Sequence, residues 1–180
     1  LYVGRGLDDL GVYWFEEPVA PEDYEGYKEL KNKLKINIAG GEAEFTKWGW
    51  KHLIQNRCID IAQPEVCGIG GITEYLKILA LAQTNFIPVV NHVWGSALSI
   101  AVNLHLLTAM PDMPGSLFPS KPMLELDTTD NNIFISDLTE EKFDIFDQVK
   151  NNNGFVKALE GHGIGLNPSK DFIKKYEVTK

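Results

Sequence analysis

The sequence contains few cysteines and no long apolar segment. It contains two cysteines among 180 residues, Cys58 and Cys67, which cannot build a disulfide framework and favour a reducing compartment. No apolar run reaches the ~18 residues that a membrane-spanning helix needs. The first residues carry no signal-peptide pattern, so we expect a cytoplasmic protein with no membrane partner.

Clustered positive charge and nucleotide-binding motifs are also missing. The formal net charge is −8 and no group of Lys and Arg forms a stripe, which argues against nucleic acid as a partner. Gly68, Gly70 and Gly71 match neither the G-x-G-x-x-G nor the phosphate-loop pattern. What the chain does have is 44% apolar residues, enough for one medium-sized domain with a hydrophobic core.

Apolar, strand-like runs alternate with helix-like runs along most of the chain. Short strands that are apolar on both faces and separated by helices predict an α/β fold, a parallel sheet covered by helices. A TIM-type barrel and a doubly wound sheet both have this pattern. The expected strands are residues 12–15, 36–39, 59–62, 87–91 and 122–127, and the expected helices are residues 21–34, with Pro21 in the first turn, 46–57, with Thr46 as N-cap, 71–85 and 96–110.

The two ends of the chain depart from this alternation. The first ten residues predict a helix that Gly11 stops, with Leu7 and Leu10 on its buried side. Residues 131–180 predict loops, a short strand at 155–159 and a last helix at 170–176. Because the chain starts inside a helix and without Met, we expect it to be the C-terminal part of something longer.

Five polar residues stand at the carboxyl ends of the expected strands, at intervals of 23 to 33 residues. They are Glu16, Glu42, Glu65, His92 and Glu125. Parallel strands end at the same edge of a sheet, and both barrels and doubly wound sheets bind ligands at that edge. For each glutamate taken alone, the alternative is a surface residue at a strand end that caps the next helix or pairs with a lysine.

Two of the residues at these strand ends suggest a site for a metal cation, and two suggest a pair that transfers a proton. Glu16 and Glu42 supply the oxygen ligands that Mg²⁺ prefers. Glu65 can accept the Nδ1–H of His92, which leaves the other ring nitrogen free to take a proton. A histidine that only packs or caps a helix is the alternative for His92, and it is the favoured interpretation of the chain's other three histidines. Gln63 and Trp94, beside these ends, are the expected substrate contacts.

The motifs WFEEP, AGGE, DIAQPEVCGIGGITE, NHVWGSALSIA and LELD, in this order, resemble the enolase superfamily and its mandelate racemase-like subgroup. Members of galactarolactone cycloisomerase and sugar-acid dehydratase type look most similar. The resemblance implies that residues 1–130 form about strands 4 to 8 of a (β/α)7β barrel of the TIM type. Residues 131–180 would be a tail that packs on a capping region, and the full-length protein is expected to be a homo-oligomer.

The resemblance also implies a role for each residue at the strand ends. Glu16 and Glu42 would hold Mg²⁺, His92 would be the general base with Glu65 as its partner, and Glu125 would stabilise the enolate. The reaction would be abstraction of the proton α to the carboxylate of a small sugar acid or hydroxy acid, leading to racemisation, dehydration or cycloisomerisation.

The chain departs from the family pattern at identifiable positions. Glu65 stands where the family usually has Asp. The third metal ligand, an Asp on the preceding strand, has no counterpart, nor do a lysine motif and an N-terminal capping domain, all of which would lie before Leu1. A catalytically inactive barrel fragment, acting as a structural or weak ligand-binding module, is therefore the alternative interpretation.

Overall fold

The computed structural model describes residues 1–111, 121–129 and 132–178, and the chain divides into two compact units. The first unit is Leu1–His92 with Pro111–Met123, and the second is Val93–Met110 with Leu124–Lys180. The predicted division into residues 1–130 and 131–180 remains a prediction.

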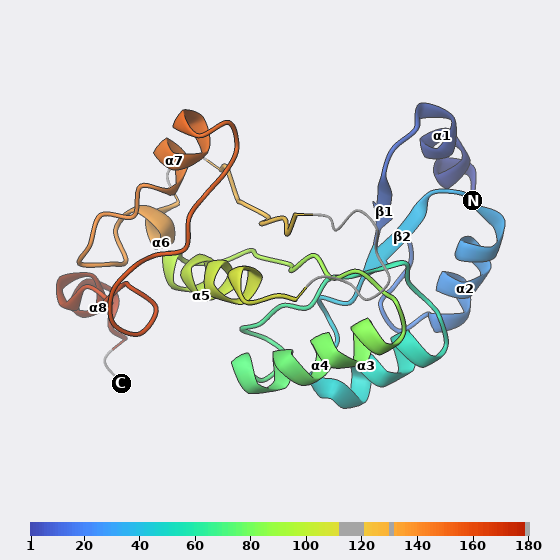
Figure 1. Ribbon diagram of the computed structural model, residues 1–180, viewed down its shortest axis with the longest axis horizontal. Coiled ribbons are helices and arrows are strands. Elements are labelled where there is room, and N and C mark those ends of the chain that lie inside the picture. Colours follow the sequence, from blue (N-terminus) through green and yellow to red (C-terminus); the bar gives the residue numbers. More distant parts are fainter. Residues whose placement is uncertain (112–120, 130–131, 179–180) are drawn as a thin grey trace. The chain divides into compact units, whose positions relative to one another are not determined.

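The first unit contains a parallel three-stranded sheet in the order β1-β2-β3, of which Figure 1 labels β1 and β2. Its strands are β1 (Trp14–Glu16), β2 (Asn37–Gly40) and β3 (Ile61–Ala62), with Glu16 in register with Ala39 and Gly40 with Ala62. Parallel neighbours need long crossovers, and each is connected here through a helix. The predicted parallel α/β alternation is thus present.

Local sequence signals set the first two helices. Helix α1 (Tyr2–Leu10) ends at Gly11, whose left-handed backbone (φ 69°) lets its N–H bond back to the last turn, as predicted. Leu10 is 80% exposed, so its predicted burial is wrong. Helix α2 (Tyr24–Lys33) starts after the N-cap Asp23, whose carboxylate accepts the Gly26 N–H at 2.9 Å. Pro21 therefore lies before the helix and not in its first turn.

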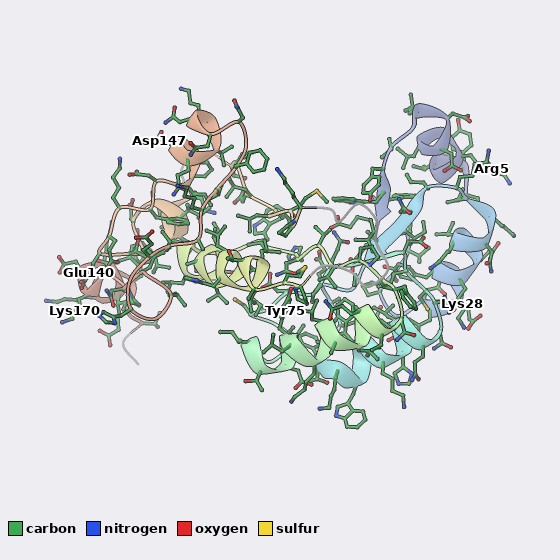
Figure 2. The ribbon with its side chains drawn as sticks, viewed as in Figure 1. Arg5, Lys28, Tyr75, Glu140, Asp147 and Lys170 are labelled. Atoms are coloured by element: carbon green, nitrogen blue, oxygen red, sulfur yellow. The ribbon has the colours of Figure 1, made fainter. Side chains whose placement is uncertain are left out.

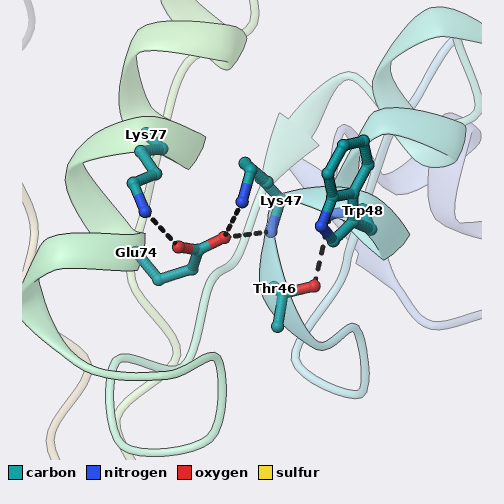
Figure 3. A network of polar contacts seen from close by, with 5 residues as sticks. All are labelled: Thr46, Lys47, Trp48, Glu74 and Lys77. Atoms are coloured by element: carbon teal, nitrogen blue, oxygen red, sulfur yellow. Dashed lines mark hydrogen bonds and ion pairs between the residues drawn. The ribbon is translucent and has the colours of Figure 1, made fainter.

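Helices α3 (Thr46–Gln55) and α4 (Ile72–Thr84) pack against each other, and a polar network joins their N-terminal halves (Figure 3). The Glu74 carboxylate accepts the backbone N–H of Lys47 at 2.9 Å and the Lys77 ammonium at 2.7 Å. The first N–H groups of a helix have no intrahelical partner, so Glu74 supplies a cap from the neighbouring helix. Thr46 is the first helical residue and Phe45 the N-cap, which corrects the prediction for Thr46.

The interior of the first unit is mostly apolar, and it includes a buried hydrogen-bonded pair. The Tyr75 hydroxyl of α4, a residue labelled in Figure 2, donates to Asn91 Oδ1 at 2.8 Å, so neither group loses hydrogen bonding on burial. Burial of large side chains on both sides of the short strands supplies the main driving force for this unit. The largest fully buried side chains here are Trp50, Tyr27, Tyr75, Ile38, Leu53, Ile54, Ile59, Ile69, Ile78 and Val66.

The second unit is helical within the part of it that the structure describes. It contains α5 (Ala97–Thr108), α6 (Ile133–Ser136), α7 (Ile145–Asn151) and α8 (Lys170–Tyr176). Ser96 caps α5 by accepting the Ser99 N–H, and Ser169 caps α8 by accepting the Phe172 N–H. The core of this unit is Val93, Ala97, Ile100, Ala101, Leu104, Ile135, Phe143, Ile145 and Leu166.

Three predicted strands do not form regular strands. Residues 87–91 contribute a single parallel bridge, Ala62 to Val89, with hydrogen bonds from the Ala62 N–H to Pro88 and from the Val90 N–H to Ala62, both 2.9 Å. Residues 122–127 and 155–159 show no ladder within the described chain. Leu124 and Leu126 pack on the core of the second unit instead, so their apolar alternation reflects packing and not strand pairing.

Candidate active site

Four of the predicted polar side chains follow different strand ends in the first unit. Glu16 is the last residue of β1, and Glu42 follows β2 by two positions. Glu65 follows β3, and His92 follows the bridge at Val89. Because the strands are parallel, all four lie at the carboxyl edge of the sheet, where the sequence placed them.

His92 lies between two carboxylates. Its Nδ1 atom is 3.0 Å from Oε2 of Glu65, and its Nε2 atom is 3.1 Å from Oε2 of Glu42. Only 14% of the His92 side chain is exposed, so both contacts are formed largely out of water. A carboxylate that accepts the Nδ1–H fixes the tautomer of the ring, and the Nε2 atom then faces the second carboxylate, Glu42.

Glu65 is itself held in place by a second contact. Its Oε1 atom accepts the backbone N–H of Cys67 at 2.9 Å, while Oε2 faces His92. Burial raises the pKa of the Glu65 carboxyl, but the hydrogen bonds from His92 and Cys67 outweigh it, and the pKa is lowered overall. Glu65 therefore stays ionised near neutral pH. The extra methylene relative to Asp does not prevent the contact with His92.

Gln63 is almost fully buried and contacts Glu16. Its Nε2 atom donates to Oε2 of Glu16 at 2.7 Å, and the residue is 4% exposed. Its Oε1 atom is buried and has no hydrogen-bond partner among the described residues. The expected contact of Gln63 with a substrate stays a prediction.

Glu17 belongs to this cluster and was missed by the sequence reasoning, which singled out only the first glutamate of WFEEP. Burial raises the pKa of Glu17, as do the nearby charges of Glu42 and Glu16, while the Gly41 N–H opposes the rise. Its backbone has φ 38°, which is uncommon for a residue with a side chain. The pair of adjacent carboxylates in the motif was the signal that could have drawn attention to it.

The oxygen atoms near Glu16 and Glu42 are of the type that a hard cation such as Mg²⁺ prefers as ligands. Glu16 ends β1 and Glu42 lies two positions after the neighbouring strand β2, and Oε1 of Glu17 and Oε1 of Gln63 are buried acceptors without partners in the described structure. Mg²⁺ is commonly held by one or two protein carboxylates, with water and substrate completing the shell. Within residues 1–111, 121–129 and 132–178, no three His, Cys, Asp or Glu side chains are arranged to hold a metal ion.

The remaining two predicted residues belong to the second unit. Glu125 accepts the backbone N–H of Val93 through Oε2 at 2.6 Å, and Trp94 is 70% exposed. The predicted roles of Glu125 toward an enolate and of Trp94 toward a substrate stay predictions.

In the described residues, no helix combines the length and apolar character needed to cross a membrane.

A family model described as enolase C-terminal domain-like matches residues 1–172. The chain belongs to this family. The match confirms the predicted resemblance to the mandelate racemase-like part of the enolase superfamily. It also confirms the fold class, an α/β fold that corresponds to the C-terminal part of a TIM-type barrel.

Individual relatives of this enolase C-terminal domain-like chain are enzymes that act on sugar acids. D-galactarolactone cycloisomerase from Agrobacterium fabrum is 33% identical over 98% of this chain and 45% of its own length. Arabinonate dehydratase from Saccharolobus solfataricus is 27% identical over 98% of this chain and 43% of its own length. The crystal structure of 3,6-anhydro-D-galactonate cycloisomerase from Zobellia galactanivorans superposes with a TM-score of 0.79 and 34% identity, over 97% and 45% of the two chains. The chain thus spans less than half the length of these relatives.

Proposed function

We propose that this chain carries the general base and two metal ligands of an enzyme that abstracts the proton α to the carboxylate of a sugar acid or related hydroxy acid. The observation that carries the proposal is the position of His92 between Glu65 and Glu42. The cycloisomerase and dehydratase relatives support the same class of reaction. Racemisation, dehydration and cycloisomerisation all begin with this proton transfer.

The base is built from two residues of the first unit, His92 and Glu65. Glu65 stays ionised and accepts the Nδ1–H of His92, which makes the imidazole more basic and fixes its tautomer. Nε2 of His92 then takes the substrate proton, and the Glu65 charge stabilises the imidazolium that results. Low exposure of His92 and Glu65 strengthens this pairing, because charges interact more strongly away from water.

Glu16 and Glu42 are the residues that would hold Mg²⁺, which when bound would supply positive charge next to the substrate carboxylate. Glu42 lies both at this corner and beside Nε2 of His92, so the carboxylate of a substrate bound there would have its α-carbon near the base. The partner of the protein in this proposal is a small-molecule carboxylate.

The decisive experiment is exchange of the substrate α-proton with solvent. The intact protein is incubated in D₂O with Mg²⁺ and each member of a panel of sugar acids, and loss of the α-proton signal is followed by ¹H NMR. Exchange that depends on both Mg²⁺ and His92 supports the proposal. Exchange that persists unchanged in the His92→Asn variant contradicts it.

A second candidate is a module without catalytic activity. It is favoured by the absence of a three-residue metal-binding group from the described residues. Calorimetry of the 180-residue chain with Mg²⁺ tests the second candidate. We expect an affinity weaker than micromolar and no useful turnover from this segment alone, and micromolar binding would contradict that expectation.

A further inference from the structure

The side chain of Gln63 connects two strand ends that are not neighbours in the sheet. The order of the strands is β1-β2-β3, so β2 lies between Glu16 at the end of β1 and Gln63 just after β3. The Nε2 atom of Gln63 nevertheless donates to Oε2 of Glu16 at 2.7 Å. The Gln63 side chain therefore reaches past the end of β2.

The backbone of Gln63 is fixed before its side chain reaches Glu16. Its N–H donates to the Gly40 carbonyl at 3.0 Å, which extends the β2–β3 ladder by one residue. The neighbouring Ala62 is bonded on its other side to Pro88 and Val90. Gln63 is 4% exposed, whereas Glu16 is exposed, so the rigid partner in this pair is the amide and the mobile partner is the carboxylate.

We propose that Gln63 is a positioning residue that holds the Glu16 carboxylate in the orientation that binds the divalent cation. Groups that hydrogen-bond a metal ligand set its orientation, and their removal commonly weakens metal binding by about 10- to 100-fold. An exposed glutamate has several rotamers of similar energy, and one fixed donor at 2.7 Å selects among them. The proposal rests on the proposed function of Glu16 as a metal ligand.

The orientation of the amide follows from the same contact. With Nε2 directed to Glu16, Oε1 is the remaining acceptor of Gln63, and it is buried without a partner among the described residues. A buried acceptor without a hydrogen bond is unfavourable unless a donor or a cation meets it. Water on the bound cation or a substrate hydroxyl would satisfy it, which deepens the substrate contact expected from the sequence.

The test compares Gln63→Met with Gln55→Met in the intact protein. Methionine keeps the length of the side chain and removes the hydrogen-bond donor, and Gln55 is an exposed glutamine near the end of α3 that serves as the matched control. Binding of Mn²⁺ is measured by electron paramagnetic resonance of the free ion, with no substrate present. We expect Gln63→Met to bind Mn²⁺ about 10- to 100-fold more weakly than wild type, and Gln55→Met to bind it equally well.

Two further measurements separate positioning from general damage. At saturating Mn²⁺, the pH dependence of α-proton exchange should be unchanged in Gln63→Met, because His92 and Glu65 are untouched. In the metal-free protein, Gln63→Met should lower the unfolding midpoint more in the wild-type background than in the Glu16→Ala background, because only the former contains the hydrogen bond.

Each contrary result has its own meaning. Equal Mn²⁺ affinity of Gln63→Met and Gln55→Met overturns the positioning role while leaving the proposed function intact. The same effect of Gln63→Met in both Glu16 backgrounds also overturns it, because the two side chains would then not interact. If the wild-type protein binds no Mn²⁺, the proposed function fails, and the positioning role fails with it.

Discussion

The Nδ1 atom of His92 lies 3.0 Å from Oε2 of Glu65, a residue 27 positions earlier in the chain. The two residues follow consecutive elements of one parallel ladder, and Cys67 fixes the far oxygen of the carboxylate. This arrangement orients an imidazole with one nitrogen committed to the protein and the other facing Glu42.

Replacement of His92 should remove proton abstraction and leave the fold in place. We expect His92→Asn to lower the rate of α-proton exchange at least ~100-fold, which is the contribution typical of a general base. The measurement is deuterium incorporation by NMR, with the unfolding midpoint recorded in parallel. His52→Asn, at an exposed histidine on α3, is the control and should exchange at the wild-type rate. A wild-type rate in His92→Asn would show that another group is the base.

Replacement of Glu65 should change the tautomer of His92. In Glu65→Gln the amide can turn its NH₂ group toward Nδ1, so we expect a larger share of the tautomer with the proton on Nε2 and a loss of activity of roughly 10- to 100-fold. Nitrogen-15 NMR of the imidazole reports the tautomer directly. An unchanged tautomer together with unchanged activity would mean that the 3.0 Å contact has no influence on the base.

The glycine before Glu42 should not tolerate a side chain. Gly41 has φ +118°, and a Cβ atom there would lie too close to the Trp50 ring. We therefore expect Gly41→Ala to destabilise the protein by roughly 2 kcal/mol, as overpacking does, and to weaken Mn²⁺ binding by displacing Glu42. Urea denaturation measures the first effect. Gly6→Ala on α1, where a Cβ atom meets nothing within 4 Å, is the control and should be neutral or slightly stabilising.

The Glu74 network should give the first unit a stability that depends on pH. Hydrogen bonds from Lys77 and from the Lys47 backbone, with further help from the Lys47 ammonium, lower the pKa of Glu74 from 4.5 to about 2. A lowered carboxyl pKa stabilises the folded state above the unfolded value near 4.5, and this stabilisation is lost as the pH falls from 4.5 through about 2.

Thermal unfolding of wild type and Glu74→Gln between pH 7 and pH 2 checks this dependence. The wild type should unfold at the higher temperature above pH 4.5, and the difference should disappear toward pH 2. Glu22→Gln, at an exposed glutamate before α2, should follow the wild type across the range. A difference that is constant with pH would show that Glu74 acts through packing and not through its charge.

Much of the framework was predictable because it depends on local sequence. The stop of α1 at Gly11 follows from the freedom of glycine at positive φ, and α8 was predicted with its observed bounds, Lys170–Tyr176. The position of Glu65 next to His92 followed from strand spacing, because parallel strand ends share one edge. The cap of α3 was not predictable, since its donor Lys47 is paired with Glu74 from another helix.

The sequence by itself determined the family pattern, the alternation of strands and helices in the first unit, and the polar residues Glu16, Glu42, Glu65 and His92 at its strand ends, since these depend on residue type and spacing along the chain. Only the tertiary structure decided which polar atoms meet. The contact of Gln63 with Glu16, the approach of Glu42 to His92 and the burial of Glu17 all join segments more than 20 residues apart. Such contacts depend on register, rotamers and close packing between elements, which no local pattern encodes.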